Sequence, residues 1–448
     1  LPHPALQQCA IGVHQVAEQL LLVGEVHVKA APRDAGGLDD PVHRGALIGN
    51  AGELLPGSPK QALAYDSTPE ATLSVNGYAY PFIDPALLQS TVPYLTYLTP
   101  FTYGFTPDGT LVELDDEALL AAARQGGAAP LMHLSTLTEE GGFSNELAHL
   151  ALTQPAVQDT LVDNLEAMLV QKGYRGLDVD FEYVYAEDAG AYAAFLGRLT
   201  ERLNPLGYPV IAALAPKIAA DQPGTLYEGH DFAAIGAAVN QVLLMTYEWG
   251  YTYGPPMAVA PLPNVRQVVE YALTEIPASK IWLGVPLYGY DWPLPFVQGR
   301  TKAQSISPQE AVARAVRYGV DIQYSEQAQA PWYRYTDGYG ITHEVWFEDA
   351  RSIQAKLALI PEYGLYGVGY WNLMRPFPQN WRVLNALQIE SINLLLGILF
   401  RRVHYSTKKH RQTLKTQHYL TVLTIYLTAN KSESRCIFSL FKSMDGCT

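Results

Sequence analysis

The strongest constraint on the fold is an alternation of short apolar runs with helical stretches, which begins near residue 73. Runs rich in β-branched and aromatic residues, separated by amphipathic segments, indicate βαβ units and a parallel sheet. Eight such units predict a (β/α)₈ barrel, and a doubly wound open sheet is the alternative. The predicted strands are residues 74–80, 94–101, 129–135, 176–183, 209–215, 241–247, 280–288 and 366–371.

The gap between the seventh and eighth predicted strands is unusually long. It covers residues from about 291 to 345 and holds three further strand-like runs at 321–324, 332–335 and 345–347. A Thr336-Asp337-Gly338 turn separates the last two. We therefore expect a small α+β insertion between strands 7 and 8.

Two segments flank the barrel, which we place at residues 71–388. Residues 1–70 show no sustained period and read as a degenerate N-terminal region with a linker. The other segment, residues 389–448, differs in charge. Residues 391–448 carry nine Lys and Arg against two Asp and Glu, whereas the whole chain has a net charge of −14. The role of this basic tail is open.

Bulk properties exclude several classes of function. The net charge of −14 disfavours binding of the main body to nucleic acid or an anionic membrane. No segment reaches the roughly 18 apolar residues of a membrane span, and the first residues do not read as a signal peptide. Cys9, Cys436 and Cys447 are the only cysteines, so residues 10–435 hold no disulfide or thiolate metal site.

The sharpest local feature is the run Gly176-Leu177-Asp178-Val179-Asp180-Phe181-Glu182-Tyr183. Alternate residues of a strand face the same side, so the three acids point into the barrel and the apolar residues point out. Close, buried carboxylates raise one another's pKa, and a protonated carboxyl is what a general acid requires. Glu182 comes last, at the strand end where barrel enzymes place their chemistry.

This run resembles the signature D-x-x-D-x-D-x-E of glycoside hydrolase family 18, which includes chitinases. Asp178, Asp180 and Glu182 match its last three acids, while Arg175 stands where the first acid is expected. Met245-Thr246-Tyr247-Glu248-Trp249 resembles the family's strand-six motif, and Tyr370-Trp371-Asn372 resembles its strand-eight motif. Longer runs are similar to the spore germination and spore-cortex N-acetylglucosaminidases, which usually carry LysM repeats. Residues 22–28 are at most a remnant of one.

The resemblance implies a retaining glycosidase in which the substrate's own acetamido oxygen attacks. Glu182 would then protonate the leaving oxygen and later activate water. Asp180 would hold the acetamido N–H, and Asp178 would share a proton with Asp180. Tyr247 would bind the acetamido carbonyl. No cofactor or metal is implied, and we expect a monomer.

Aromatic side chains near the predicted strand ends are candidates for binding sugar rings, whose apolar faces stack on Trp and Tyr. The resemblance places Trp371 under the sugar at the cleavage site. The other expected substrate contacts are Tyr78, Tyr103, Met245, Trp249, Tyr290 and Trp292.

Three functions stay open at this point. The first is an N-acetylglucosaminidase that cleaves spore-cortex peptidoglycan and is spore- or cell-wall-associated or extracellular. The second is a chitinase that acts on poly-N-acetylglucosamine. The third is a lectin-like barrel that binds sugar without catalysis, but the acid at Glu182 favours an enzyme.

Overall fold

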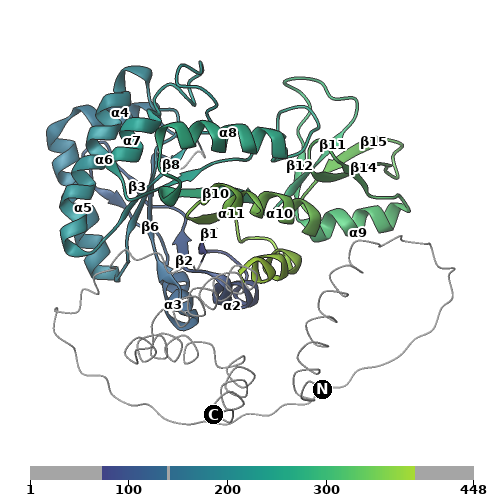
Figure 1. The fold of residues 1–448 in the computed structure, drawn as a ribbon, viewed down its shortest axis with the longest axis horizontal. Coiled ribbons are helices and arrows are strands. Elements are labelled where there is room, and N and C mark those ends of the chain that lie inside the picture. Colours follow the sequence, from purple (N-terminus) through teal and green to yellow (C-terminus); the bar gives the residue numbers. More distant parts are fainter. Residues whose placement is uncertain (1–72, 139–141, 389–448) are drawn as a thin grey trace, which may run out of the picture. The chain divides into compact units, whose positions relative to one another are not determined.

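The structure is a computed structural model that describes residues 73–138 and 142–388 (Figure 1). The described residues all belong to one compact unit. Our interpretations of residues 1–70, including the LysM remnant, and of residues 389–448 lie outside the described residues. Among the described residues, no helix has the length and apolar content to cross a membrane.

A closed parallel barrel forms the centre of the fold. Its sheet has the order β5-β2-β1-β16-β10-β9-β8-β7-β6. β5 pairs with β2, while β6 begins two residues later and pairs with β7, so the two segments act as one strand and close the barrel. The strands are β1 Ser74–Ala79, β2 Tyr97–Pro100, β5 Ala129–Pro130, β6 Met132–Ser135, β7 Leu177–Asp180, β8 Val210–Leu214, β9 Gln241–Leu244, β10 Ile281–Pro286 and β16 Gly367–Trp371.

All eight predicted strands are therefore present, and the (β/α)₈ prediction is confirmed over the open-sheet alternative. Several end earlier than predicted, because their last residues leave the sheet at the carboxyl end. β7 ends at Asp180, two residues before Glu182, and β9 ends at Leu244, three residues before Tyr247. The residues expected to carry chemistry thus lie on the loops directly after these strands.

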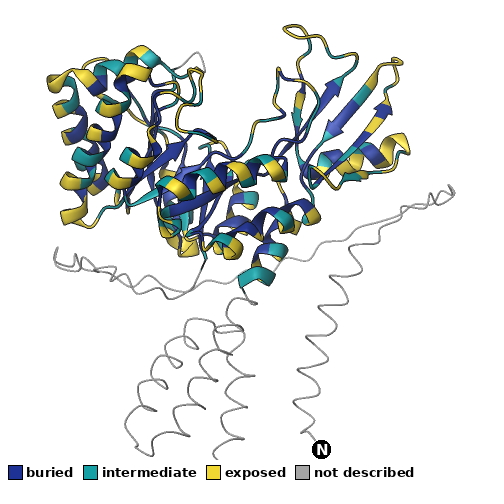
Figure 2. Cartoon of the chain, turned by 45° about the horizontal axis from the view of Figure 1, so that its top comes forward, coloured by how far each residue is buried: buried dark blue, intermediate teal, exposed yellow. Residues whose placement is uncertain are grey.

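Helices cover the outside of the barrel and turn a buried face toward it (Figure 2). In α5 the buried residues include Leu161, Leu165 and Leu169, and Gly173 ends the helix in the left-handed region at φ +72°. Residues 378–388 are also helical. The other helices are α2 Pro85–Thr91, α3 Glu117–Gly126, α4 Asn145–Thr153, α5 Pro155–Lys172, α6 Ala189–Leu203, α7 Phe232–Ala238, α8 Leu262–Glu275, α10 Ala350–Leu357 and α11 Leu359–Tyr363.

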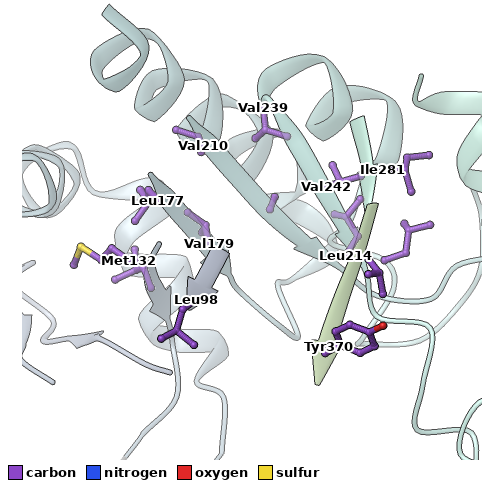
Figure 3. Close-up of a cluster of buried hydrophobic side chains, with 14 of the residues drawn as sticks. Leu98, Met132, Leu177, Val179, Val210, Leu214, Val239, Val242, Ile281 and Tyr370 are labelled. Atoms are coloured by element: carbon purple, nitrogen blue, oxygen red, sulfur yellow. The ribbon is translucent and has the colours of Figure 1, made fainter. Parts of the chain in front are cut away.

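The barrel has two separate apolar cores. The larger one lies between the strands and the helices and includes Leu177, Val179 and Val242 (Figure 3). Burying each such side chain contributes about 1.5–3 kcal/mol. The smaller one fills the barrel interior with Leu131, Ile211, Leu243 and Trp282. The interior core therefore occupies the part of the barrel that the polar site residues leave free.

The predicted insertion is present as a five-stranded antiparallel sheet with the order β12-β11-β15-β14-β13. It begins at Gly289, earlier than predicted, with only two residues between it and the end of β10. β11 and β12 were not predicted from the sequence, because the proline and glycine residues around them indicate turns. The elements are β11 Gly289–Pro293, β12 Gln304–Ile306, α9 Pro308–Tyr318, β13 Gln323–Ser325, β14 Ala330–Thr336 and β15 Thr342–Trp346.

Candidate active site

The side chains around β7 alternate as the sequence predicts. Leu177, Val179 and Phe181 lie in the outer core. Asp178 points the opposite way, into the barrel, where the hydroxyl of Tyr78 on β1 donates a hydrogen bond to its Oδ2 at 2.6 Å. Because β1 and β7 are not neighbours in the sheet, this bond crosses the barrel interior.

Asp178 and Asp180 are both buried, and neither contacts a Lys or Arg side chain of the described residues. Burial raises the pKa of Asp178 to about 7, although the Tyr78 hydrogen bond acts in the opposite direction. Burial, followed by the charges of Glu182 and Asp178, raises the pKa of Asp180 well above its ordinary value. The Oδ1 atoms of both carboxyls have no hydrogen-bond partner among the described residues. Buried polar atoms are normally paired, so these two oxygens are available to a ligand.

Glu182 follows at the mouth of the barrel and is half-buried. Burial, followed by the charge of Glu248, raises its pKa to about 7. The next residue, Tyr183, is held in the left-handed region at φ +57°. Such a conformation costs a non-glycine residue about 1–3 kcal/mol and is found most often where a site needs it. A carboxyl with this pKa is partly protonated at neutral pH, as general acid catalysis requires.

Tyr247 reaches the same site from the loop after β9. Burial, followed by the charges of Asp180, Glu182, Glu248 and Asp178, raises its pKa well above the ordinary value, so its hydroxyl keeps its proton. Gly284 on β10 makes room for the ring, because a Cβ there would lie 2.9 Å from Cε1 of Tyr247 and 2.2 Å from the carbonyl oxygen of Leu244. Met245, two residues earlier, is buried.

Glu248 is a site residue that the sequence analysis quoted in a motif but did not single out. Its φ of +67° turns it out of the strand direction directly after Tyr247. The Tyr288 hydroxyl donates to its Oε1, and the Tyr290 hydroxyl lies 3.1 Å from Oε1 and 3.2 Å from Oε2. Burial raises the pKa of Glu248 against the effect of these two bonds. A positive φ cannot be read from sequence, and the adjacent Tyr247 was the only available signal.

Trp371, the last residue of β16, lies beside an aromatic wall. Its ring centroid is 5.7 Å from that of Tyr78, 4.8 Å from that of Phe101 and 6.1 Å from that of Tyr80. The three contacts are edge-to-face, which fixes the indole while its own surface stays partly exposed. A fixed, partly exposed indole can stack under a sugar ring.

Two predicted substrate contacts are placed elsewhere by the structure. Tyr103 forms a bridge beside Leu134, whose side chain is in the outer core, and so points out of the barrel. Its hydroxyl donates to Oδ2 of Asp116 at 2.5 Å, and the residue is fully buried. Trp292 is also fully buried in the insertion, where its Nε1 donates to the carbonyl oxygen of Gly254 at 2.8 Å. Neither ring offers surface to a ligand.

The other predicted contacts divide into two groups. Tyr78 and Tyr290 are buried, and the hydroxyl of each donates a hydrogen bond to a carboxylate of the site. Their role in this arrangement is to hold Asp178 and Glu248. Trp249 is half-buried and packs against the outer core. Of the predicted aromatic contacts, Trp371 alone combines exposed surface with a place in the wall.

Two histidines near the site have structural roles, because both are buried and make hydrogen bonds to neighbouring groups. Burial lowers the pKa of His133 to about 3, so the ring is neutral, with Nδ1 2.7 Å from the Thr102 hydroxyl and Nε2 3.7 Å from Asp180. His230 accepts from the backbone N–H of Ala215 and lies 2.9 Å from the Phe181 carbonyl oxygen, which ties β7 to β8. Within residues 73–138 and 142–388, no group of His, Cys, Asp and Glu is arranged to hold a metal.

A comparison with known families matches residues 91–375 to the model of glycosyl hydrolases family 18. The chain belongs to glycosyl hydrolases family 18. It is therefore a glycosidase, and the resemblance noted from its acid motif is confirmed. The match covers all barrel strands except β1 and includes the whole insertion.

Individual members of the family give closer matches. A cortical fragment-lytic enzyme of Bacillus subtilis (strain 168) is 46% identical over 293 residues, which cover 65% of this chain and 68% of that enzyme. The putative sporulation-specific glycosylase YdhD of the same organism is 38% identical over 323 residues, covering 72% and 76%. The crystal structure of the Bacillus cereus spore cortex-lytic enzyme SleL superposes with a TM-score of 0.68 at 40% identity, covering 70% of this chain and 73% of that one.

Arg175 is the one departure from the family 18 acid signature. Its side chain is exposed, and it precedes β7 at the end of the barrel opposite Glu182. Its backbone N–H donates to the Pro130 carbonyl oxygen at 2.8 Å, a bond that does not depend on the side chain. The departure therefore leaves the three inward-facing acids unchanged.

Proposed function

We propose that the chain is a retaining N-acetylglucosaminidase that cleaves the glycan strands of spore-cortex peptidoglycan. The names of its relatives support this substrate, since the B. subtilis enzyme is named a cortical fragment-lytic enzyme and the B. cereus enzyme a spore cortex-lytic enzyme. The proposal also makes the protein a component of the spore or the cell wall. The chemistry is argued below from the site.

Glu182 is the proposed acid and base. At neutral pH a pKa of about 7 leaves part of the population protonated, so that the carboxyl can donate its proton to the leaving oxygen. The resulting carboxylate then takes a proton from the incoming water. Its place at the mouth of the barrel, half-buried, allows both the sugar and the water to reach it.

Asp180, Asp178 and Tyr247 are proposed to orient the substrate's acetamido group. The free Oδ1 of Asp180 accepts the acetamido N–H, and the protonated Tyr247 hydroxyl donates to the acetamido carbonyl oxygen. That oxygen attacks the sugar's anomeric carbon and forms a cyclic oxazolinium-like intermediate. Asp178 shares a proton with Asp180, since two close buried acids do not both ionise readily. Trp371 stacks under the sugar.

The observation that carries this mechanism is the pair of buried, unpaired Oδ1 atoms on Asp178 and Asp180. A nucleophilic carboxylate on another strand would support the ordinary two-carboxylate mechanism instead. Glu248 is the rival, because its charge acts on Glu182. Both of its oxygens already accept tyrosine hydroxyls, which makes it a weak nucleophile.

Substrate chemistry tests the two mechanisms directly. Aryl N-acetylglucosaminides should be hydrolysed, whereas the matching aryl glucosides, which lack the acetamido group, should be almost inert. A thiazoline analogue of the cyclic intermediate should bind much more tightly than substrate, because it copies the geometry that the site stabilises. Comparable turnover of both glycosides, or a sugar ester trapped on Glu248, would show that a carboxylate attacks.

Product analysis separates the proposed substrate from the alternatives. Mass spectrometry of digests should show N-acetylglucosamine at the new reducing ends of cortex peptidoglycan, with slower release from chitin. Faster cleavage of chitin would make the protein a chitinase, an activity named for a solved structure from Chromobacterium violaceum that is 25% identical with a TM-score of 0.65. Binding without any product would indicate a lectin-like barrel.

A further inference from the structure

One half-buried arginine of the described structure lacks the carboxylate partner that the other half-buried arginines have. Arg198, Arg266 and Arg314 each form an ion pair with an aspartate or a glutamate. Arg375, in the loop after β16, donates from Nη2 to the Ser305 hydroxyl at 3.1 Å and has no carboxylate partner among the described residues. Charged side chains that leave the surface are normally paired, so Arg375 is a cation available to an anionic ligand.

The charge of Arg375 is not compensated by any nearby acid of the described residues. Burial lowers the pKa of its guanidinium, and the phenols of Tyr290 and Tyr288 act in the opposite direction. The ordinary pKa of arginine is so far above neutrality that the group stays cationic. Because a half-buried charge is costly without a partner, an anion that binds here is stabilised.

The side chain of Arg375 connects the barrel to the insertion beside the active site. It extends from the loop after β16 to Ser305 on β12, which pairs with Tyr290 on β11. Tyr290 binds Glu248 and belongs to the apolar cluster against which Trp371 packs. Arg375 follows Trp371 by four residues, so their Cα atoms are separated by no more than about 14 Å. The guanidinium is therefore within reach of a sugar adjacent to the one on Trp371.

The hydrogen-bonding capacity of Arg375 specifies the kind of anion. A guanidinium has five N–H donors in a planar fork, and Ser305 accepts from one nitrogen only. The other donors have no protein partner in the described structure. Two parallel N–H groups of such a fork match the two oxygens of a carboxylate.

The two polymers considered as substrates differ in this chemical group. Chitin is neutral along its length. The muramic acid of peptidoglycan carries a lactyl group, which ends either in a free carboxylate or in a stem peptide with carboxylates of its own. The acids of the site, Asp180, Glu182 and Glu248, would repel such a group. A cation beside them offsets this repulsion and favours a substrate with negative charge.

We propose that Arg375 binds a carboxylate of the glycan strand, carried by the sugar adjacent to the one on Trp371, and thereby selects peptidoglycan over chitin. The inference rests on the proposed glycosidase function and names the group by which that site recognises its substrate. Arg375 is a specificity-determining residue and takes no part in proton transfer.

Substrates that differ only in charge test this in the wild-type protein. The first pair is a peptidoglycan oligomer with free lactyl carboxylates and the same oligomer with these groups converted to amides. The second pair carries stem peptides whose carboxylates are free or amidated. In one of the pairs kcat/KM should be about tenfold higher on the acid than on the amide, mainly through KM, because charge-assisted hydrogen bonds are the stronger ones. The pair that shows the preference identifies the carboxylate as lactyl or peptide.

Variants assign the preference to Arg375. Arg375→Gln removes the charge, and the ratio of kcat/KM on acid and amide should fall to about one. Arg375→Lys keeps the charge without the planar fork and should retain only part of the preference. Arg317→Gln removes an exposed cation of α9 and is the matched control for net charge, so it should keep the full preference. An equal loss in Arg317→Gln would overturn the proposal, because the preference would then follow net charge.

A purely structural role of Arg375 gives a different result. Ser305→Ala removes the hydrogen bond between the loop and β12 but leaves the charge, so it should keep most of the preference. If Ser305→Ala loses as much as Arg375→Gln, or if Arg375→Gln lowers kcat/KM on acid and amide alike, Arg375 only holds the loop and the proposal is overturned. Unfolding midpoints identify any destabilised variant, and the wild-type comparison does not depend on the variants.

The outcomes separate this proposal from the function on which it rests. If the wild type cleaves neither the oligomers nor an aryl N-acetylglucosaminide, the proposed function fails. If it cleaves the oligomers at N-acetylglucosamine but reacts equally with acid and amide in both pairs, the function stands and the role of Arg375 is overturned. A preference of about tenfold that Arg375→Gln abolishes supports the role.

Discussion

Buried carboxylates are treated in opposite ways by the barrel and by the insertion. In the barrel, Asp178 has one tyrosine partner and Asp180 faces a neutral histidine at 3.7 Å, and each has an unpaired oxygen. In the insertion, Asp291 is equally buried, yet both of its oxygens are paired. Arg314 and the Tyr335 hydroxyl bind Oδ2, while Nδ1 of His343 lies 2.7 Å from Oδ1.

The difference shows that burial alone does not mark a functional acid. Burial costs any carboxylate several kcal/mol, and in the insertion a cation and two further partners offset that cost. In the barrel the described structure supplies no cation to these acids, and the Tyr78 hydrogen bond offsets only part of the cost for Asp178. The cost therefore appears as raised pKa values on all three acids. Carboxyls left in this state are the ones available for proton transfer.

The largest effect is expected at Glu182. Glu182→Gln keeps the size and hydrogen-bonding capacity of the side chain but cannot donate a proton, so kcat on an aryl N-acetylglucosaminide should fall by about 10²–10⁴ or more. The fold and sugar binding should be retained. Glu187→Gln, a neighbouring exposed acid, is the matched control and should behave as the wild type. Near wild-type turnover in Glu182→Gln would exclude it as the acid.

A smaller effect, this time on stability, is expected in the insertion. Asp291→Asn removes one of the two carboxylates that Arg314 contacts and leaves Glu310 as the remaining anion of this partly buried guanidinium. We expect a loss of about 1–3 kcal/mol in the free energy of unfolding, measured by denaturant titration. The exposed Asp321→Asn should cost less than about 0.5 kcal/mol. Equal stability of the two variants would mean that the insertion acid is not held by its partners.

The corresponding Asp-to-Asn substitution at Asp178 in the barrel should raise the free energy of unfolding at neutral pH instead of lowering it. The pKa of Asp178 rises from 3.8 in the ordinary state to about 7 in the folded protein. The protonated carboxyl is favoured in the folded state, so its stabilising contribution is complete below about pH 4. This contribution to the free energy of unfolding is lost as the pH rises to about 7. Each pKa unit corresponds to about 1.4 kcal/mol, so the loss approaches about 4 kcal/mol.

Asp178→Asn removes this ionisation. Its unfolding midpoint should fall less than that of the wild type between pH 5 and pH 8, so that the variant becomes the more stable protein at the higher pH. Activity should fall in the variant, because the proton shared with Asp180 is gone. If the unfolding midpoints of wild type and variant change with pH in the same way, Asp178 does not have the raised pKa.

Much of the fold and part of the site follow from sequence because both depend on local pattern. The eight strands are visible as apolar runs. Along the fourth strand acidic and apolar residues alternate, so Asp178, Asp180 and Glu182 point into the barrel while Leu177 and Val179 point out. This alternation is a property of a single strand, so it can be predicted without knowing which strands lie beside it. β11 was missed because its neighbourhood of proline and glycine indicates a turn.

Features that depend on contacts between distant segments could not be predicted. Tyr103 has the same spacing along the chain as the inward residues of β2, but the chain leaves β2 after Pro100, and Tyr103 then pairs beside Leu134. The tyrosines that hold Glu248 lie 40 and 42 residues away in the chain. The partners of Asp291 lie 23, 44 and 52 residues away in the chain. Sequence alone could therefore not distinguish its fully paired state from that of Asp178, which keeps one unpaired oxygen.

The smallest effect is expected where the chain departs from its family. Arg175→Asp restores the first acid of the signature, and we expect less than a twofold change in kcat/KM and less than about 0.5 kcal/mol in stability. Arg175 is exposed and lies seven residues before Glu182, which at about 3.3 Å per residue places it roughly 20 Å away. Charges at that distance in solvent are largely screened at physiological salt. A shift of the pH profile of kcat/KM in Arg175→Asp would contradict this, because it would show that the first position acts on the three inward acids.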